Sequence, residues 1–176
     1  KIQDGCDQFC SYCIIPYARG PIRSRDFHDV LERLKGLQSS GYKETVLTGI
    51  HLASYGRGTD KDLTDLLERI GEQAPDMKIR LGSMDPSYLN EERILRLSRI
   101  PNLCAHYHLS LQSGCDATLK RMNRRYTTGE YAHIAKLLQK HIPDVSLTTD
   151  IIVGFPGETQ EEFEETLAFV QSIGFY

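Results

Sequence analysis

The chain has 176 residues, a formal net charge of −3, 40% hydrophobic residues and 26% charged residues, values that fit one globular domain with its own core. No apolar run reaches the roughly 18 residues that a membrane span requires, and the N-terminal stretch KIQDGCDQFC lacks the apolar segment of a signal peptide. The negative net charge gives the chain no general attraction to nucleic acid.

Strands and helices alternate along the chain. β-rich runs predict a first strand ending at Cys6 and further strands at 45–52, 78–84, 104–111 and 145–153. Apolar residues at helical spacing predict a helix after each strand, on the stripes 27–37, 63–70, 91–99, 131–138 and 163–170. In the last stripe Phe163, Leu167 and Val170 are expected to face the core. Two Thr-x-x-Glu capping boxes, beginning at residues 127 and 159, predict where the last two helices start.

Consecutive βα units predict a parallel sheet with right-handed crossovers. The strands are continuous apolar runs more than alternating ones, which favours a sheet covered on both faces. Because so few units do not easily close a barrel, we expect an α/β fold: an open, incomplete (β/α) barrel, a horseshoe of parallel strands with outer helices. The active site of such a fold lies at the carboxyl ends of its strands. Residues 174–176 resemble the start of a sixth strand, and the missing initiator Met suggests a piece of a longer protein.

Three of the five cysteines, Cys6, Cys10 and Cys13, follow the first strand with C-x3-C-x2-C spacing. Such clustering and the odd total favour a reducing, cytoplasmic setting over a disulfide framework. Three thiolates on one loop suit an iron–sulfur cluster, and a 4Fe-4S cluster would then keep one iron open for a ligand. A zinc half-site and a redox dithiol are the alternatives. No zinc-spaced Cys/His pair follows, and a dithiol leaves one cysteine unexplained. Cys104 and Cys115 have no companion, and Cys104 is expected to be a buried small hydrophobe.

The C-x3-C-x-aromatic-C loop after the first strand resembles the signature of radical S-adenosylmethionine (radical SAM) enzymes. Longer strings resemble the methylthiotransferases, most closely the branch that acts on threonylcarbamoyladenosine in tRNA: KIQDGC, CIIPYARG, LTGIHLASYG, HLSLQSGCD, RMNRRYTTGEY and TTDIIVGFPGET. The resemblance covers residues 1–176 and implies one truncated radical SAM core domain. It also implies that an N-terminal auxiliary-cluster domain and a C-terminal RNA-binding domain are absent from this stretch.

The resemblance implies an enzyme whose 4Fe-4S cluster, held by the three clustered cysteines, reductively cleaves S-adenosylmethionine to a 5′-deoxyadenosyl radical. The radical would serve to methylthiolate a modified adenosine next to the anticodon. The implied partners are tRNA, through the full-length protein, and an electron donor such as flavodoxin or ferredoxin, with no membrane. A second 4Fe-4S cluster is expected only in the full-length protein. The alternatives are a methylthiotransferase for a ribosomal protein side chain and, more distantly, a non-catalytic zinc-binding domain.

The resemblance also implies cofactor-binding residues at the strand ends. Tyr12 corresponds to a residue whose backbone meets the adenine, and the turn of Gly49, Ile50 and His51 to one that binds the methionine amino group. That turn has one glycine instead of the commoner pair. Arg125 is the candidate for the methionine carboxylate, because a guanidinium binds carboxylates with two donors. The remaining candidates are Ser83, Gln112, Ser113, Asp150, Gly154 and Phe155.

Some of these residues have a simpler structural explanation. His51 could be a solvated loop residue. Arg80, near the end of the third strand and a further candidate for a ligand contact, could instead form a surface ion pair. Two basic groups on the same loops suggest a phosphate-binding rim, although charged loops also serve solubility. The rim residues are Arg19, Arg23, Arg25, Lys120, Arg121, Arg124 and Arg125.

Overall fold

A computed structural model of the chain describes residues 1–175. The N-terminal half contains β1 (Gln3–Asp4), α1 (Ile15–Arg19), β2 (Arg23–Ser24), α2 (Phe27–Ser39), β3 (Glu44–Leu47), the 3₁₀ helix η1 (Leu52–Ser54), α3 (Leu63–Gln73) and β4 (Lys78–Leu81). The C-terminal half contains the 3₁₀ helix η2 (Pro86–Tyr88), α4 (Glu91–Ser98), β5 (His106–His108), α5 (Asp116–Arg121), α6 (Thr128–His141), β6 (Ser146–Thr148) and α7 (Gln160–Ile173). The last residue of the predicted sixth-strand start, Tyr176, lies outside the described residues.

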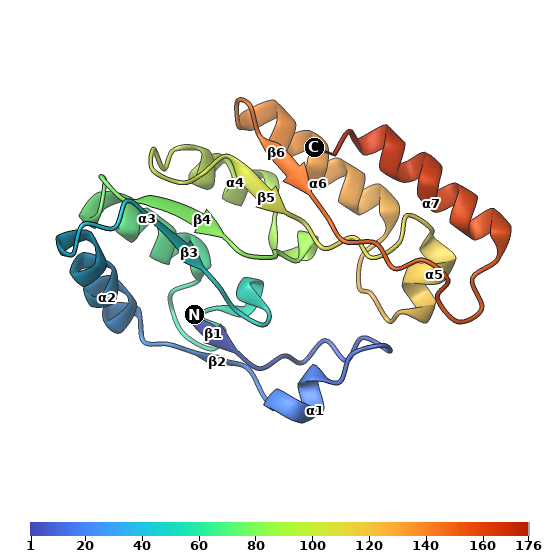
Figure 1. The fold of residues 1–176 in the computed structure, drawn as a ribbon, viewed down its shortest axis with the longest axis horizontal. Coiled ribbons are helices and arrows are strands. Elements are labelled where there is room, and N and C mark those ends of the chain that lie inside the picture. Colours follow the sequence, from blue (N-terminus) through green and yellow to red (C-terminus); the bar gives the residue numbers. More distant parts are fainter. Residues whose placement is uncertain (176) are drawn as a thin grey trace.

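The strands β3 to β6 run parallel, as predicted (Figure 1). β3 pairs with β4, and β5 pairs with β6. Parallel bridges from Ile79 to Leu103 and from Met84 to Leu109 join the two pairs. On the other side, the Ile2 N–H donates to the Thr48 carbonyl at 2.8 Å, which places β1 beside the end of β3. Within residues 1–175 these strands form an open, incomplete barrel, and the predicted fold class is confirmed.

Two details of the strand prediction are wrong. β1 pairs antiparallel with β2, which lies inside the segment expected to be a loop. The main strands also end earlier than predicted, β3 at Leu47 and β6 at Thr148. Beyond these points single backbone bonds link the neighbouring segments, such as those of Gln112 with residues 150 and 152. Side chains provide other partners: the His51 N–H, for example, donates to the Gln3 amide oxygen.

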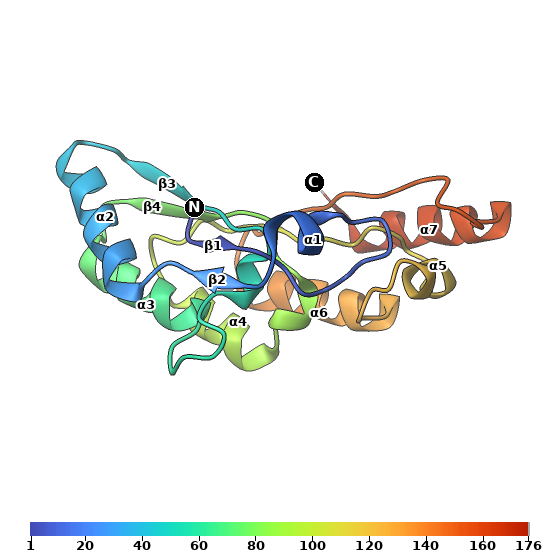
Figure 2. The same cartoon turned by 90° about the horizontal axis from the view of Figure 1, so that it is seen from below.

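Helices cover only one face of the sheet (Figure 2). Along β4 and β5 the side chains alternate: Ile79, Leu81 and Tyr107 are buried, whereas Arg80 and His106 on the opposite face are partly exposed. The expectation of cover on both faces is therefore wrong for the described residues. The strands have the alternation of a half-buried sheet, and their other face is open and largely polar.

The predicted helices are present, with their apolar stripes in the core. Leu63, Leu66, Leu67 and Ile70 on α3 are at most 1% exposed. Burial of each such side chain contributes about 2 kcal/mol. Both predicted capping boxes are formed, at the starts of α6 and α7. Among the described residues no helix combines the length and apolar character needed to cross a membrane.

The orientation of α7 differs from the prediction. Leu167 is 47% exposed, whereas Thr166 and Ile173 are buried. The Thr166 hydroxyl accepts the Gly114 N–H at 3.1 Å, so the helix turns this polar residue inward. Gly114 permits the approach, because a Cβ at that position would lie 2.9 Å from the Thr166 Cα.

Candidate active site

The cysteine loop, residues 6–13, follows β1 at the carboxyl end of the strands. Its three thiols are free; Cys10 is buried, while Cys6 and Cys13 are half-buried. The Cys6 N–H donates to the Gly20 carbonyl at 3.2 Å, and the Cys13 N–H to the Cys10 carbonyl at 2.9 Å. The second bond closes a turn that keeps the last two cysteines on one side of the loop.

The cysteine loop is fixed by the segment that ends α5. Ser11 donates from its N–H to the Met122 carbonyl at 3.1 Å and from its hydroxyl to the Arg121 carbonyl at 2.8 Å. In return, the Asn123 side-chain amide donates to the Phe9 carbonyl at 2.9 Å. The loop after β1 and the segment after β5 thus form one site, as expected for loops at the same edge of a parallel sheet.

A buried ion pair lies behind the cysteines. The Arg124 Nη2 is 3.2 Å from the Asp85 Oδ2, and the two side chains are only 9% and 7% exposed. Arg124 also donates from Nη1 to the Cys10 Sγ at 3.3 Å and from Nε to the Tyr126 hydroxyl at 3.0 Å. The sequence favoured Arg125, but it is Arg124 that contacts a cysteine, whereas Arg125 is exposed. Spacing alone does not distinguish two adjacent arginines.

The charges in this group are strongly perturbed. Burial alone would raise the pKa of Asp85, but hydrogen bonds from His51 and Ser87 and the charge of Arg124 lower it to about 2. Burial raises the pKa of the Cys6 thiol, the Gln8 N–H lowers it, and the neighbouring Cys10 raises it further. The Cys6 and Cys10 sulfurs are therefore close enough for a charge on Cys10 to act on Cys6.

The turn at residues 49–51 is held against β1. The Gln3 amide accepts the His51 N–H at 2.7 Å and donates to the Gly5 carbonyl at 2.8 Å. A Cβ at Gly49 would lie 2.9 Å from the Gln3 Cβ, so this contact requires glycine. Gln3, only 2% exposed, is a site residue that the sequence analysis missed, since a glutamine within a strand gives no signal.

The His51 imidazole faces the cysteine loop. Its Nε2 lies 3.5 Å from the Asp85 Oδ2 and 3.4 Å from the Gln8 Nε2, and its Nδ1 is hydrogen-bonded to Ser54. The side chain is 13% exposed. It is therefore part of the site and not a solvated loop residue. Ile50, beside it, is half-buried.

The end of β6 meets the cysteine loop through aromatic rings. The Phe155 ring lies edge-on to Tyr12, with ring centroids 6.3 Å apart. Burial raises the pKa of Tyr12 to about 12. Gly154, next to Phe155, has a positive φ of 73° and donates its N–H to the Glu158 carboxylate. Asp150 is exposed, and its carboxylate lies 3.4 Å from the His108 Nε2.

The other predicted positions differ in how accessible they are. Ser83 is exposed after β4, and Gln112 is half-buried with its backbone bonded to Asp150 and Ile152. The Ser113 side chain is fully buried, and its hydroxyl bonds to Thr166 and to the Cys115 N–H. A ligand cannot reach the Ser113 hydroxyl without displacing these partners.

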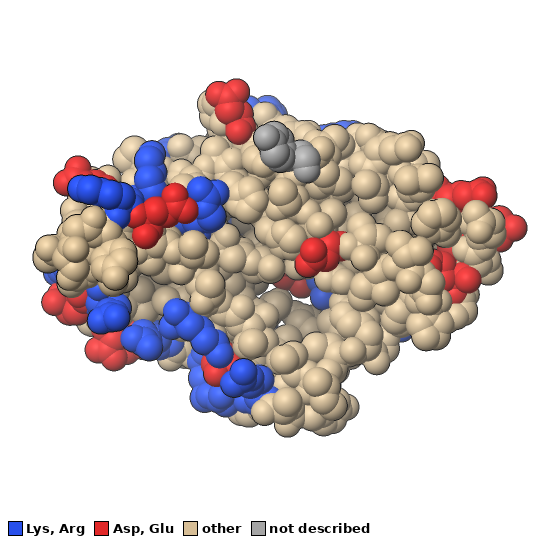
Figure 3. Space-filling model, viewed as in Figure 1, with Lys and Arg blue, Asp and Glu red and all other residues tan. Residues whose placement is uncertain are grey.

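Some basic side chains of the expected rim are neutralised within the fold. Arg121 pairs with Glu162, and Arg124 with Asp85. Outside the rim, Arg80 bonds to Glu44 at 2.7 Å, so the surface ion pair expected as its alternative role is what forms. Lys and Arg side chains gather over β1, β2 and α1 (Figure 3), where Arg19, Arg23 and Arg25 of the expected rim are exposed together with Lys1. Of these, Lys1 and Arg23 pair with Asp4.

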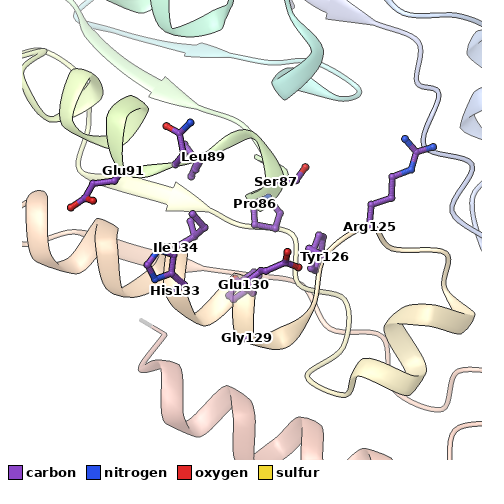
Figure 4. Close-up of a pocket in the computed structure, with 12 residues that line it drawn as sticks. Pro86, Ser87, Leu89, Glu91, Arg125, Tyr126, Gly129, Glu130, His133 and Ile134 are labelled. Atoms are coloured by element: carbon purple, nitrogen blue, oxygen red, sulfur yellow. The ribbon is translucent and has the colours of Figure 1, made fainter.

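A pocket of about 480 Å³ lies between η2 and α6 (Figure 4). Pro86, the neighbour of Asp85, and Tyr126, which bonds to Arg124, belong to its lining. Arg125 and His133 add polar atoms to the same wall. The pocket therefore adjoins the ion pair on its helical side.

One of the two isolated cysteines differs from expectation. Cys115 lies on a loop directly before α5 and is the buried one, at 2% exposure. Cys104 is only half-buried, because it lies just before β5 where the backbone begins to pair with Ile79. The prediction of a buried small hydrophobe thus applies to Cys115 and not to Cys104.

The donor set suits an iron–sulfur cluster. Three free thiols on one loop, with the Arg124 cation bonded to one of them, match the negative charge of a thiolate-ligated cluster.

Comparison with known proteins identifies relatives along the whole chain. The tRNA-2-methylthio-N(6)-dimethylallyladenosine synthase of Clostridium perfringens is 41% identical over 176 residues, which make up 99% of this chain and 39% of the relative. The threonylcarbamoyladenosine tRNA methylthiotransferase MtaB of Bacillus subtilis is 44% identical over 177 residues, again 99% of this chain and 39% of the relative. The chain thus spans about two fifths of the length of these relatives.

Solved structures show the same fold at low sequence identity. The radical S-adenosylmethionine methyltransferase TsrM of Kitasatospora setae superposes with a TM-score of 0.81 at 16% identity, covering 98% of this chain and 34% of that one. Methylornithine synthase gives a TM-score of 0.68 at 13% identity, covering 97% and 48%. A family model described as the radical SAM superfamily matches residues 1–170. The chain belongs to the radical SAM superfamily.

Proposed function

We propose that residues 1–176 are the catalytic core domain of a tRNA methylthiotransferase that acts on a modified adenosine next to the anticodon. The observation that carries the proposal is the set of three free thiols on one loop at the carboxyl ends of the strands. Identities of 41% and 44% to tRNA methylthiotransferases support this enzyme class. The relatives are tRNA-modifying enzymes by name, which also supports tRNA as the partner of the whole protein and the cytoplasm as its compartment.

The proposed mechanism assigns a task to each part of the site. Cys6, Cys10 and Cys13 would hold a 4Fe-4S cluster, which when bound supplies the electron that cleaves S-adenosylmethionine. The turn at 49–51 would receive the methionine end of the cofactor, as the resemblance implies, with Gly49 required there by the close approach of Gln3. Gln3 keeps that turn in position through the His51 N–H.

The opposite end of the cofactor would lie under aromatic cover. Tyr12 and Phe155, already in edge-on contact, would flank the adenine and exclude water from it. Asp150, exposed just after β6, would accept a hydrogen bond from a ribose hydroxyl. We also retain Ile50, Ser83, Gln112, Arg125 and Gly154 as proposed cofactor contacts. Ser113 is retained with them only on condition that the cofactor displaces the Thr166 and Cys115 partners of its hydroxyl.

For the substrate we propose threonylcarbamoyladenosine, in line with the resemblance of the longer motifs and the 44% identity to MtaB. Dimethylallyladenosine is the second candidate, favoured by the relative that is 41% identical. The test is to give the full-length, anaerobically reconstituted protein tRNA that carries one modification or the other, together with a reductant such as reduced flavodoxin. Mass spectrometry of the nucleosides should show the methylthio group on threonylcarbamoyladenosine. Methylthiolation of neither nucleoside would contradict the proposed function.

The cluster assignment has its own test. Replacement of Cys6, Cys10 or Cys13 by Ala should abolish cluster binding, measured as iron and sulfide content and as visible absorption under anaerobic conditions. Cys104→Ala and Cys115→Ala are the matched controls and should keep the cluster. An intact cluster in the Cys10→Ala protein would contradict the assignment.

A further inference from the structure

Hydrogen bonds to the clustered cysteine sulfurs are few and unequal. Among the described residues the Gln8 N–H donates to the Cys6 Sγ at 3.5 Å, and the Arg124 Nη1 donates to the Cys10 Sγ at 3.3 Å. The first donor is a neutral backbone group of the loop itself. The second carries a full positive charge and comes from a residue 114 positions away.

The Arg124 guanidinium is fixed from behind. Asp85 holds Nη2 at 3.2 Å, and the Tyr126 hydroxyl accepts from Nε at 3.0 Å. Asp85 is itself oriented by Ser87, whose hydroxyl and N–H donate to its Oδ1 at 2.6 Å and 3.0 Å. With Nε and Nη2 bonded to Tyr126 and Asp85, the Nη1 group of Arg124 points toward the Cys10 sulfur. Because the Arg124 side chain is only 9% exposed, water does little to screen its charge.

A charged donor at a thiolate ligand has a defined effect on a cluster. Reduction adds an electron to a centre that is already negative, and hydrogen bonds to its sulfurs stabilise the added charge. We propose that Arg124 is a positioning residue that raises the reduction potential of the cluster through its hydrogen bond to Cys10, with Asp85 holding it in place and moderating its charge. This inference rests on the proposed function, since it requires the cluster.

The experiment measures the midpoint potential of the reconstituted full-length protein by redox titration followed by electron paramagnetic resonance, without S-adenosylmethionine. Arg124→Gln removes the charge and should shift the potential to a more negative value. Arg124→Lys keeps the charge but loses the fork, and should shift it less. Arg121→Gln is the control. Arg121 is three residues before Arg124, but its guanidinium bonds to Glu162 on α7, so the potential should stay unchanged. Iron content is determined for every variant.

Asp85→Asn tests the direction of the potential shift independently. Loss of the counter-charge beside Arg124 should move the potential in the opposite direction, to a less negative value. This variant decides the matter if neither Arg124 variant takes up the cluster: an unchanged potential in Asp85→Asn would then overturn the proposal.

Two further outcomes are distinguishable. If Arg124→Gln keeps the wild-type potential but binds S-adenosylmethionine more weakly, Arg124 is a cofactor contact and the proposal is wrong. If the wild-type protein takes up no 4Fe-4S cluster at all, the proposed function fails, independently of what any Arg124 variant does.

Discussion

Replacement of Asp85 by Ala would leave the Arg124 guanidinium buried without its counter-charge. The two side chains are 7% and 9% exposed, and their closest charged atoms are 3.2 Å apart, so neither water nor another carboxylate takes over. Removal of one partner of such a pair costs about 3–5 kcal/mol. Ser87 loses the acceptor of its N–H and hydroxyl at the same time. We therefore expect the free energy of unfolding to fall by about 3–5 kcal/mol.

Urea denaturation followed by circular dichroism measures this loss. Glu32→Ala is the matched control, since it breaks an exposed ion pair with Lys35 and should cost less than about 1 kcal/mol. The double variant Asp85→Ala/Arg124→Leu should recover most of the stability, because no buried charge is then left unpaired. If Asp85→Ala costs no more than Glu32→Ala, the pair is solvated and the reasoning is refuted.

Three further predictions concern stability. Because the Asp85 pKa is lowered to about 2 from 3.8, this carboxylate contributes about 2 kcal/mol that is fully present above pH 4–5 and lost as the pH falls toward 2. Acid urea titrations should show a larger loss of stability in wild type than in Asp85→Asn. Gly49→Ala should lower the free energy of unfolding by about 1–3 kcal/mol, measured by thermal unfolding, since the new Cβ would meet Gln3. Gly36→Ala is the control: it lies in open space on α2 and should raise the free energy of unfolding by about 0.5–1 kcal/mol. Equal effects of the two substitutions would contradict the close contact. Thr159→Ala removes the capping box of α7 and should cost about 0.5–2 kcal/mol in chemical denaturation, and no loss would mean the cap is dispensable.

Local patterns in the sequence predicted a large part of the structure. Both capping boxes and the buried stripe of α3 follow from residues three or four positions apart, which interact within one helix. The cysteine spacing likewise selects three thiols on one loop. The parallel order of β3 to β6 follows from the alternation of strands and helices.

The features that the sequence did not reveal depend on distant partners. Arg124 differs from Arg125 only in meeting Asp85, which is 39 positions away. Leu167 is exposed because Thr166 bonds to Gly114, 52 positions away. Gln3 gains its role from a turn 48 positions later. The open polar face of the sheet is a different case: β4 and β5 alternate polar and apolar residues, which is a local signal of a half-buried strand, but the predicted strands were longer and mostly apolar.

The anchoring of the cysteine loop has a consequence for the order of events during biogenesis. The loop is held by residues far along the chain: Ser11 bonds to Arg121, 110 residues away. Phe9 bonds to Asn123 and Cys10 to Arg124, each 114 residues away. Closing so long a stretch of chain carries an entropic cost that only the folded core between the two segments offsets. The three thiols therefore reach their final arrangement after α3, α4 and the parallel strands have assembled, although they are among the first residues of this stretch to be synthesised. Iron and sulfide would then be inserted into a chain that has already folded, so a change that prevents this core from folding would also be detected as a missing cluster.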